Sequence, residues 1–233
     1  MAASPKVARR DLKEDKVYLT IAEVAAFLAR NRLWIAMGGL IALVAFALTY
    51  FVHARSQRVA AEASWALYQA NRQEDTSEKM AALEEITAEY RRTAAGRLAS
   101  FELANALYND GRYEEAMKRF QEFLKKNPNH LLAPAALEAT GYCQESLGLW
   151  AEAIKTYQSL ITRHAGNPAS ARSHYRLGLC YEETGEKEKA IQAYEKTVEL
   201  VPETVWSEYA MKRLDSIRPS VRAKEEAHPE AAE

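Results

Sequence analysis

The sequence has 233 residues, of which 27% are charged, and its formal net charge is −1. This charge is unevenly divided, because residues 1–32 carry seven Lys/Arg and four Asp/Glu whereas residues 53–233 carry 24 and 28. The acidic C-terminal part disfavours nucleic-acid binding through phosphate contacts. It is also long enough to form one domain with its own core.

The head of the chain, residues 1–32, divides into two parts. Residues 1–16 are polar with mixed charge, and we expect them to be disordered. From Val17 to Arg30 apolar residues recur at helical spacing, which predicts an amphipathic helix. Such a helix either lies along a membrane surface or continues the following helix into water, and the sequence leaves both alternatives open.

Residues 33–52 form a run of 20 residues without a charge. A helix of this length, at about 1.5 Å per residue, matches a hydrocarbon core about 30 Å thick. Trp34 and Tyr50 lie near its ends, where amphipathic rings favour the headgroup region. No small-residue cleavage motif clearly follows. We therefore predict an uncleaved transmembrane helix. The more basic head favours a cytoplasmic N-terminus, with the rest of the chain on the other side.

Residues 57–217 are expected to form a domain of repeats. Three segments align at a spacing of 37 residues: 97–130, 134–167 and 171–204. They share a glycine (Gly111, Gly148, Gly185), an alanine (Ala116, Ala153, Ala190) and an aromatic residue (Phe120, Tyr157, Tyr194). The glycine suits a left-handed turn at the end of a first helix. A single helical hairpin cannot bury its apolar face, so the pattern predicts an all-α solenoid of stacked hairpins.

Both ends of the repeat domain have less regular segments. Residues 62–95 fit a degenerate repeat on the basis of Trp65, Tyr68 and Ala81. Residues 206–217 are expected to form a capping helix that covers the open end with Tyr209, Met211 and Leu214. Residues 218–233 are charged and contain proline, and we expect a disordered tail.

The shared positions resemble the tetratricopeptide repeat, which has a small residue at its eighth position, glycine near the fifteenth and alanine at the twentieth. Ala104, Gly141 and Gly178 occupy the eighth position here. The second repeat departs from the pattern, because Thr140 and Gln144 stand where Leu and Tyr are usual.

The stretch from Ala60 to Ala116, with AAEASWALYQ and LASFELANALYNDGRYEEA, resembles the YfgM-like family of ancillary SecYEG translocon subunits. This resemblance implies a single-pass protein of the bacterial inner membrane with a periplasmic repeat domain. Its implied partners are the Sec translocon, a membrane-anchored isomerase-like chaperone and emerging client chains. The repeats are also similar to those of the Tol–Pal-associated cell-division coordinator. That similarity offers the alternative of an envelope assembly or division coordinator, which binds Tol–Pal or peptidoglycan-associated partners.

The sequence contains no recognisable catalytic constellation. Its five histidines form no metal-ligand pairs at helical spacing, and there is no glycine-rich phosphate loop. We therefore predict a non-enzymatic protein without cofactor or metal. Cys143 and Cys180 occupy the same position of successive repeats, so we expect two separate buried thiols too far apart for a disulfide.

The first helices of such repeats line a groove, and the corresponding positions form our candidate peptide-binding site. It comprises Leu98, Phe101, Asn105, Tyr108, Glu138, Tyr142, Arg172, Tyr175, Arg176 and Leu179. Its four aromatic residues suit either an extended apolar peptide or packing on neighbouring repeats, and both alternatives stay open.

A carboxylate clamp is a further use of such a groove. Arg172 and Arg176 lie one helical turn apart, but Phe101 and Ala139 replace the Lys and Asn that a clamp needs. We therefore interpret the arginine pair as a solvated face.

Overall fold

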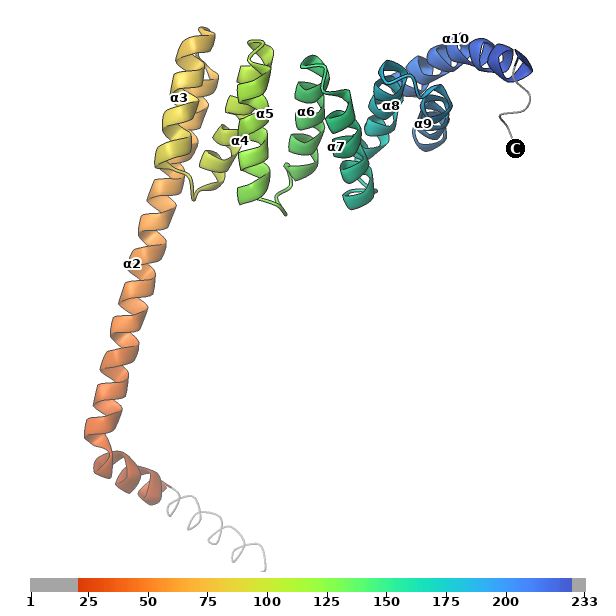
Figure 1. The fold of residues 1–233 in the computed structure, drawn as a ribbon. Helices are drawn as coiled ribbons and strands as arrows, with labels where there is room; N and C mark the ends of the chain where they lie inside the picture. Colours follow the sequence, from red (N-terminus) through yellow and green to blue (C-terminus); the bar gives the residue numbers. More distant parts are fainter. Residues whose placement is uncertain (1–20, 228–233) are drawn as a thin grey trace, which may run out of the picture. The chain divides into compact units, whose positions relative to one another are not determined.

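The computed structural model describes residues 21–227, with side chains up to Pro219 (Figure 1). Every regular element within this range is an α-helix, which confirms the predicted all-α class. The disorder expected for residues 1–16 lies outside the described residues, as do residues 17–20 of the amphipathic helix and 228–233 of the tail. The chain divides into two compact units, Met1–Arg58 and Val59–Glu233. We call them the N-terminal unit and the repeat unit.

In the N-terminal unit, a helix over residues 21–30 is separated by a turn at Asn31 from α2 (Arg32–Asn71). The backbone N–H and the side-chain amide of Asn31 both donate to the Phe27 carbonyl, at 3.0 and 2.9 Å. Figure 1 shows that the 21–30 helix bends away from α2 at this point. Within the described chain, α2 alone is long and apolar enough to cross a membrane, and none of its apolar window is buried.

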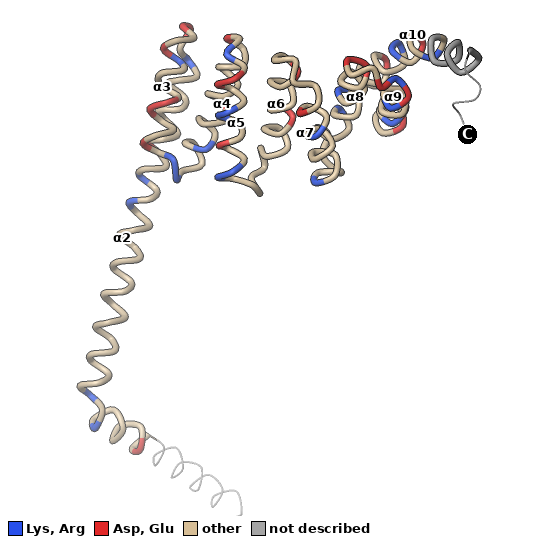
Figure 2. The backbone as a smooth tube through the Cα atoms, viewed as in Figure 1, with Lys and Arg blue, Asp and Glu red and all other residues tan. Residues whose placement is uncertain are grey.

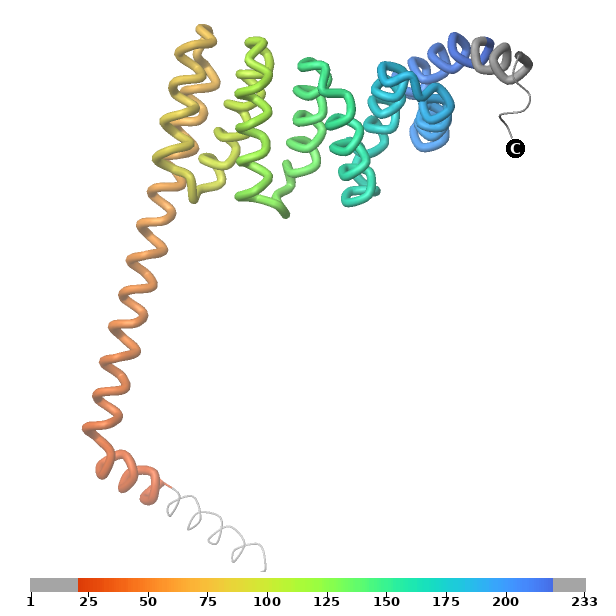
Figure 3. Tube along the Cα trace, in the orientation of Figure 1, coloured from red at the N-terminus to blue at the C-terminus, as the bar shows by residue number. Residues whose placement is uncertain are grey.

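The repeat unit contains the end of α2 and the helices that follow it (Figure 3). These are α3 (Thr76–Glu89), α4 (Ala94–Asn109), α5 (Tyr113–Lys126), α6 (Ala133–Ser146), α7 (Trp150–Arg163), α8 (Pro168–Glu183), α9 (Lys187–Leu200) and α10 (Val205–Ala227). From α3 onward each helix packs against the next along the chain. The first helices α4, α6, α8 and α10 also contact one another in succession. Stacked hairpins with this order of contacts form the predicted α-solenoid.

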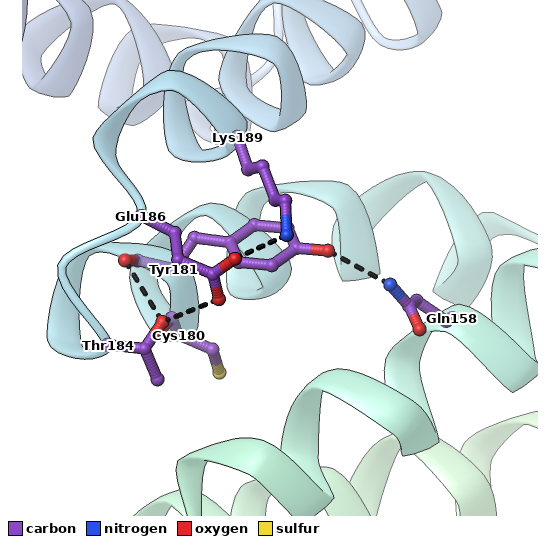
Figure 4. Close-up of polar contacts among 6 residues, drawn as sticks. All are labelled: Gln158, Cys180, Tyr181, Thr184, Glu186 and Lys189. Carbon is purple, nitrogen blue, oxygen red and sulfur yellow. Dashed lines mark hydrogen bonds and ion pairs between the residues drawn. The ribbon is translucent and has the colours of Figure 1, made fainter.

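The three recurrent glycines turn each hairpin. Gly111, Gly148 and Gly185 have φ values of 80, 71 and 78°, in the left-handed region where glycine carries no steric penalty. Figure 4 shows the turn around Gly185, where the Thr184 hydroxyl donates to the Cys180 and Tyr181 carbonyls at 3.2 Å each. Across the α7–α8 interface, the Gln158 amide donates to the Tyr181 hydroxyl at 2.9 Å.

The degenerate first repeat packs through residues other than those expected. Ala63, Leu67 and Ala70 of α2 are buried, in the same core as Leu83 and Ile86 of α3. Trp65 and Tyr68 are instead 61% and 51% exposed, and their rings stack on each other with centroids 5.5 Å apart. The face of α2 that lies in this core therefore carries Ala63, Leu67 and Ala70, and the two aromatic rings lie outside it.

The C-terminal cap also differs from expectation. Leu214 is buried as predicted, but Tyr209 and Met211 are exposed, and Ala210 and Ile217 complete the buried face. The reason is the 37-residue period: Ala210, Leu214 and Ile217 follow the buried residues Ser173, Leu177 and Cys180 by one repeat. Helix α10 is therefore placed as the first helix of a further repeat, and it continues to Ala227, beyond the expected end at residue 217.

The second repeat accommodates its two unusual residues differently. The Thr140 hydroxyl donates to the Ala136 carbonyl at 2.7 Å, so its polar group is satisfied within α6. Gln144 is also buried, and its Oε1 has no hydrogen-bond partner among the described residues. The departure from the repeat pattern thus leaves a polar atom unsatisfied in the core.

Close contact between the two helices of a hairpin depends on a small residue at the eighth position, which is glycine in the second and third repeats. A Cβ added to Gly178 would lie 2.4 Å from the Tyr194 ring, and one added to Gly141 would lie 2.4 Å from the Tyr157 ring. In the first repeat, Ala104 and Phe120 occupy these positions, and both are fully buried.

Substitution of Gly178 by alanine is expected to destabilise the repeat unit by about 1–3 kcal/mol, because the new methyl group overpacks against the Tyr194 ring. Gly166→Ala is the matched control, since a Cβ there meets nothing within 4 Å. Urea unfolding followed by circular dichroism measures both variants. Equal midpoints for the two variants would contradict the close-contact argument.

The two cysteines are free and buried, as expected, and burial raises the pKa of each thiol to about 12. Because the thiolate is the reactive form, neither should react with iodoacetamide in the folded protein at pH 8. Both should react in concentrated guanidinium chloride, and mass spectrometry counts the added groups. Rapid labelling of the native protein would show that these helices open readily.

Candidate functional site

The predicted groove residues lie on the first helices α4, α6 and α8, which contact one another in succession. We call their shared surface, extended by α10, the first-helix face. Because the first helices carry it from one repeat to the next, a ligand along it would meet side chains from several repeats. The structure divides it into three regions with different chemistry.

The N-terminal region comes from α4 and is partly apolar. Leu98 is 36% exposed, whereas Phe101 is half-buried with its ring 5.6 and 5.8 Å from the rings of Phe120 and Phe123. Tyr108 is also half-buried, 5.2 Å from the Tyr113 ring. Phe101 and Tyr108 thus pack on the second helix of their own repeat, α5.

Asn105 lies beside a polar pocket of about 490 Å³. The pocket is lined by Asn71, Thr76, Lys79, Glu102, Asn105, Ala106 and Asn109. The Asn71 amide donates to the Glu102 carboxylate across α2 and α4 at 2.8 Å. Amide and carboxylate groups of this kind can bind the backbone of an extended peptide through hydrogen bonds.

The middle region is occupied by two ion pairs between repeats. Arg172 of α8 binds Glu138 of α6 through two hydrogen bonds, at 3.0 and 2.6 Å. One turn further along, Arg176 binds Glu145 in the same bidentate manner, with Nε 3.0 Å from Oε1. The interpretation of a solvated face is therefore wrong, because the two carboxylate side chains are only 7% and 9% exposed.

The second ion pair belongs to a larger network that recurs. The Tyr157 hydroxyl donates to Glu145, which also binds Arg176 of the next repeat. One repeat later the Tyr194 hydroxyl donates to Glu182, and Arg213 of α10 lies 3.6 Å from the same carboxylate. The first repeat lacks this network, because Phe120, Tyr108 and Ala139 occupy the three positions.

Electrostatics keep these arginines charged. Hydrogen bonding to Glu138 raises the pKa of Arg172. Burial lowers the pKa of Arg176, but Glu145 and Tyr157 together raise it, and the net change is upward. Burial raises the pKa of Tyr157 well above its ordinary value, so the hydroxyl stays protonated and donates to Glu145. The Arg176 guanidinium also lies over the Tyr142 ring, 4.8 Å from its centroid. These arginines are thus already engaged and are not available for a carboxylate clamp.

The C-terminal region is aromatic. The ring centroid of Tyr175 on α8 lies 5.7 Å from that of Trp206 and 6.1 Å from that of Tyr209, both on α10. The Tyr209 side chain is 43% exposed. Leu179 is partly buried and packs against the C-terminal hydrophobic core, which includes Leu177 and Tyr194. Our sequence prediction did not include Trp206 and Tyr209 in the site. The repeat period could have identified Tyr209, because it follows the candidate groove residue Arg172 by 37 residues.

The site offers binding groups and no evident reaction chemistry. Among the described residues, no three His, Cys, Asp or Glu side chains are grouped so as to hold a metal ion. The side chains on the first-helix face are aromatic rings, amides and paired charges. They suit recognition of a protein segment, with polar groups at one end and rings at the other.

Comparison with known proteins agrees with this architecture. The tetratricopeptide repeat family matches residues 69–130, 101–168 and 150–203, which together span more than half of the chain. A search of curated proteins gave no match.

Several solved structures have a similar fold. A double mutant of MamA from RS-1 is 25% identical, with a TM-score of 0.56 over 70% of this chain and 84% of that one. MamA 41-end from Desulfovibrio magneticus RS-1 is 22% identical, with a TM-score of 0.54 over 73% and 97%. A tetratricopeptide repeat protein from Parabacteroides merdae is 16% identical, with a TM-score of 0.58 over 70% and 61%. The chain belongs to the tetratricopeptide repeat family, whose repeats form scaffolds for protein–protein interaction.

Proposed function

We propose that this protein is a membrane-anchored adaptor, an ancillary subunit of the Sec translocon in the bacterial inner membrane. Its N-terminus lies in the cytoplasm and its repeats lie in the periplasm. There the repeats recruit an isomerase-like chaperone or contact secreted chains as they emerge. The resemblance of residues 60–116 to the YfgM-like family supports the choice of partner.

The observation that carries the anchored-scaffold part of the proposal is the dual composition of α2. Its N-terminal part is apolar and uncovered, with Leu33 and Trp34 more than 70% exposed. Its C-terminal part buries Ala63, Leu67 and Ala70 in the core of the repeat unit. A helix that ends inside the repeat core and begins as an apolar rod would hold the scaffold at a membrane without a separate linker.

The first-helix face is the proposed recognition surface, and its three regions have different roles. The ion pairs of Arg172 and Arg176 stiffen the middle by joining α6 to α8. The polar pocket around Asn105 and the aromatic region around Tyr209 remain available at the two ends. Exposed rings favour apolar side chains of a partner, so we place the principal contact at Tyr209 and Trp206.

A photocrosslinking amino acid at Tyr209 should capture translocon subunits and a periplasmic isomerase in intact cells. Purification through a tag after Glu233, followed by mass spectrometry, identifies the products. Lys155 is the matched control position, because it is exposed but lies on α7 outside the first-helix face. Division or cell-wall proteins in place of the translocon would favour the envelope-coordinator alternative. Equal capture from Lys155 would argue against the face itself.

The proposed topology has its own test. Alkaline phosphatase fused after Glu233 should be active in cells, because that enzyme matures only outside the cytoplasm. A reporter enzyme that is active only in the cytoplasm should be inactive when it is fused at the same point. Enzyme assays on whole cells measure the activities of both fusions. The reverse pattern would place the repeats in the cytoplasm and exclude a role with emerging secreted chains.

A further inference from the structure

The charges of the repeat unit are separated between its two edges. At one edge, turns connect each second helix to the next first helix. Around the first three of these turns lie six basic residues: Arg91, Arg92, Arg97, Lys125, Lys126 and Arg163. We call these six residues the basic edge. In Figure 2 basic segments mark the lower ends of α5 and α7, while acidic segments gather at the upper end of α3 and around α8.

The opposite edge, which contains the glycine turns, is acidic. Asp110, Glu114 and Glu115 outnumber Arg112 at one turn, and Glu182, Glu183, Glu186 and Glu188 outnumber Lys187 and Lys189 at another. Helix dipoles favour part of this separation, because they stabilise acidic first turns and basic last turns such as Lys125 and Lys126 of α5. Arg91 and Arg92 lie in the turn beyond the end of α3, so the dipole does not explain them.

The basic edge is accessible and largely unpaired. Arg91, Arg92, Lys125 and Arg163 are exposed and form no ion pair among the described residues. Lys126 lies 3.9 Å from Glu122, and Glu62, Glu85 and Glu89 lie near Tyr90, beside the first of these turns. Leu131, in the turn between α5 and α6, is 88% exposed, more than any other large apolar side chain in the described chain. An apolar tip between basic side chains is typical of a surface that meets lipid headgroups.

A short segment joins the apolar run to the repeat unit. The repeat unit begins at Val59, and the first of its core residues on α2 is Ala63. First helices begin at the edge that carries the basic residues. Seven residue steps separate Val52, the end of the apolar run, from Val59. Even a fully extended chain spans at most about 25 Å over this distance.

We propose that the basic edge docks on anionic lipid headgroups of the membrane that α2 spans, with Leu131 at the interface. This inference rests on the membrane anchoring of the proposed function. Basic clusters close to a membrane are attracted to anionic lipids, and the attraction decays within about 10 Å at 0.1 M salt. The fourth turn of this edge carries Glu199, Glu203 and Glu208, so contact is confined to the first three turns.

The test uses the full chain in lipid vesicles, with Asn129→Cys labelled by a donor fluorophore and an acceptor dye on lipid headgroups. Asn129 is exposed beside Leu131, and the native cysteines are buried. Energy transfer should be higher in vesicles that contain phosphatidylglycerol than in vesicles of neutral phosphatidylcholine. High salt should return it to the neutral level.

A pair of matched variants tests the role of the basic edge. Arg91→Glu with Lys125→Glu should abolish the increase in energy transfer. Lys118→Glu with Lys155→Glu changes the net charge equally on the exposed sides of α5 and α7, and it should retain the increase. Equal loss in both double variants, or no response to lipid charge, would overturn the inference.

Flotation with neutral vesicles separates this inference from the proposed function. A chain that floats with neutral vesicles but shows no response to lipid charge remains anchored, and only the docking is refuted. A chain that does not float refutes the anchoring and the docking together.

Discussion

The contact between the eighth residue of a first helix and the aromatic ring of its second helix is the constraint on which the repeats depend. In the second and third repeats the residue is glycine, and no Cβ fits between Gly178 and the Tyr194 ring. The first repeat uses Ala104 with Phe120 instead. Each hairpin is thereby closed at one small residue, and its remaining apolar surface becomes available to the next hairpin.

The choice of ring has consequences beyond the hairpin. A buried tyrosine needs an acceptor for its hydroxyl, and Tyr157 finds it in Glu145. A carboxylate that is largely buried in turn needs a cation, and Arg176 of the next repeat supplies it. The glycine, tyrosine, glutamate and arginine thus depend on one another, and together they link two successive repeats. Where Phe120 replaces tyrosine, the glutamate and the arginine are absent as well.

This network shapes the proposed recognition surface. The charged side chains in the middle of the first-helix face are already paired with each other. Recognition is left to the polar pocket beside Asn105 and the rings around Tyr209. The basic edge lies around the turns between repeats, so a scaffold lying on a membrane by that edge would keep the rest of its first helices free for a partner. Membrane contact and protein recognition then use different surfaces of one solenoid.

The sequence by itself determined the helical class, the 37-residue period, the glycine turns and the apolar helix, because each is encoded in local spacing and composition. It also indicated that Cys143 and Cys180 are separate and buried. Only the tertiary structure decided that Arg172 and Arg176 are paired, since their partners lie 34 and 31 residues away on another helix. It likewise decided that α2 buries Ala63, Leu67 and Ala70 and leaves Trp65 and Tyr68 exposed. These outcomes depend on helix rotation and packing between repeats, which local periodicity leaves undetermined.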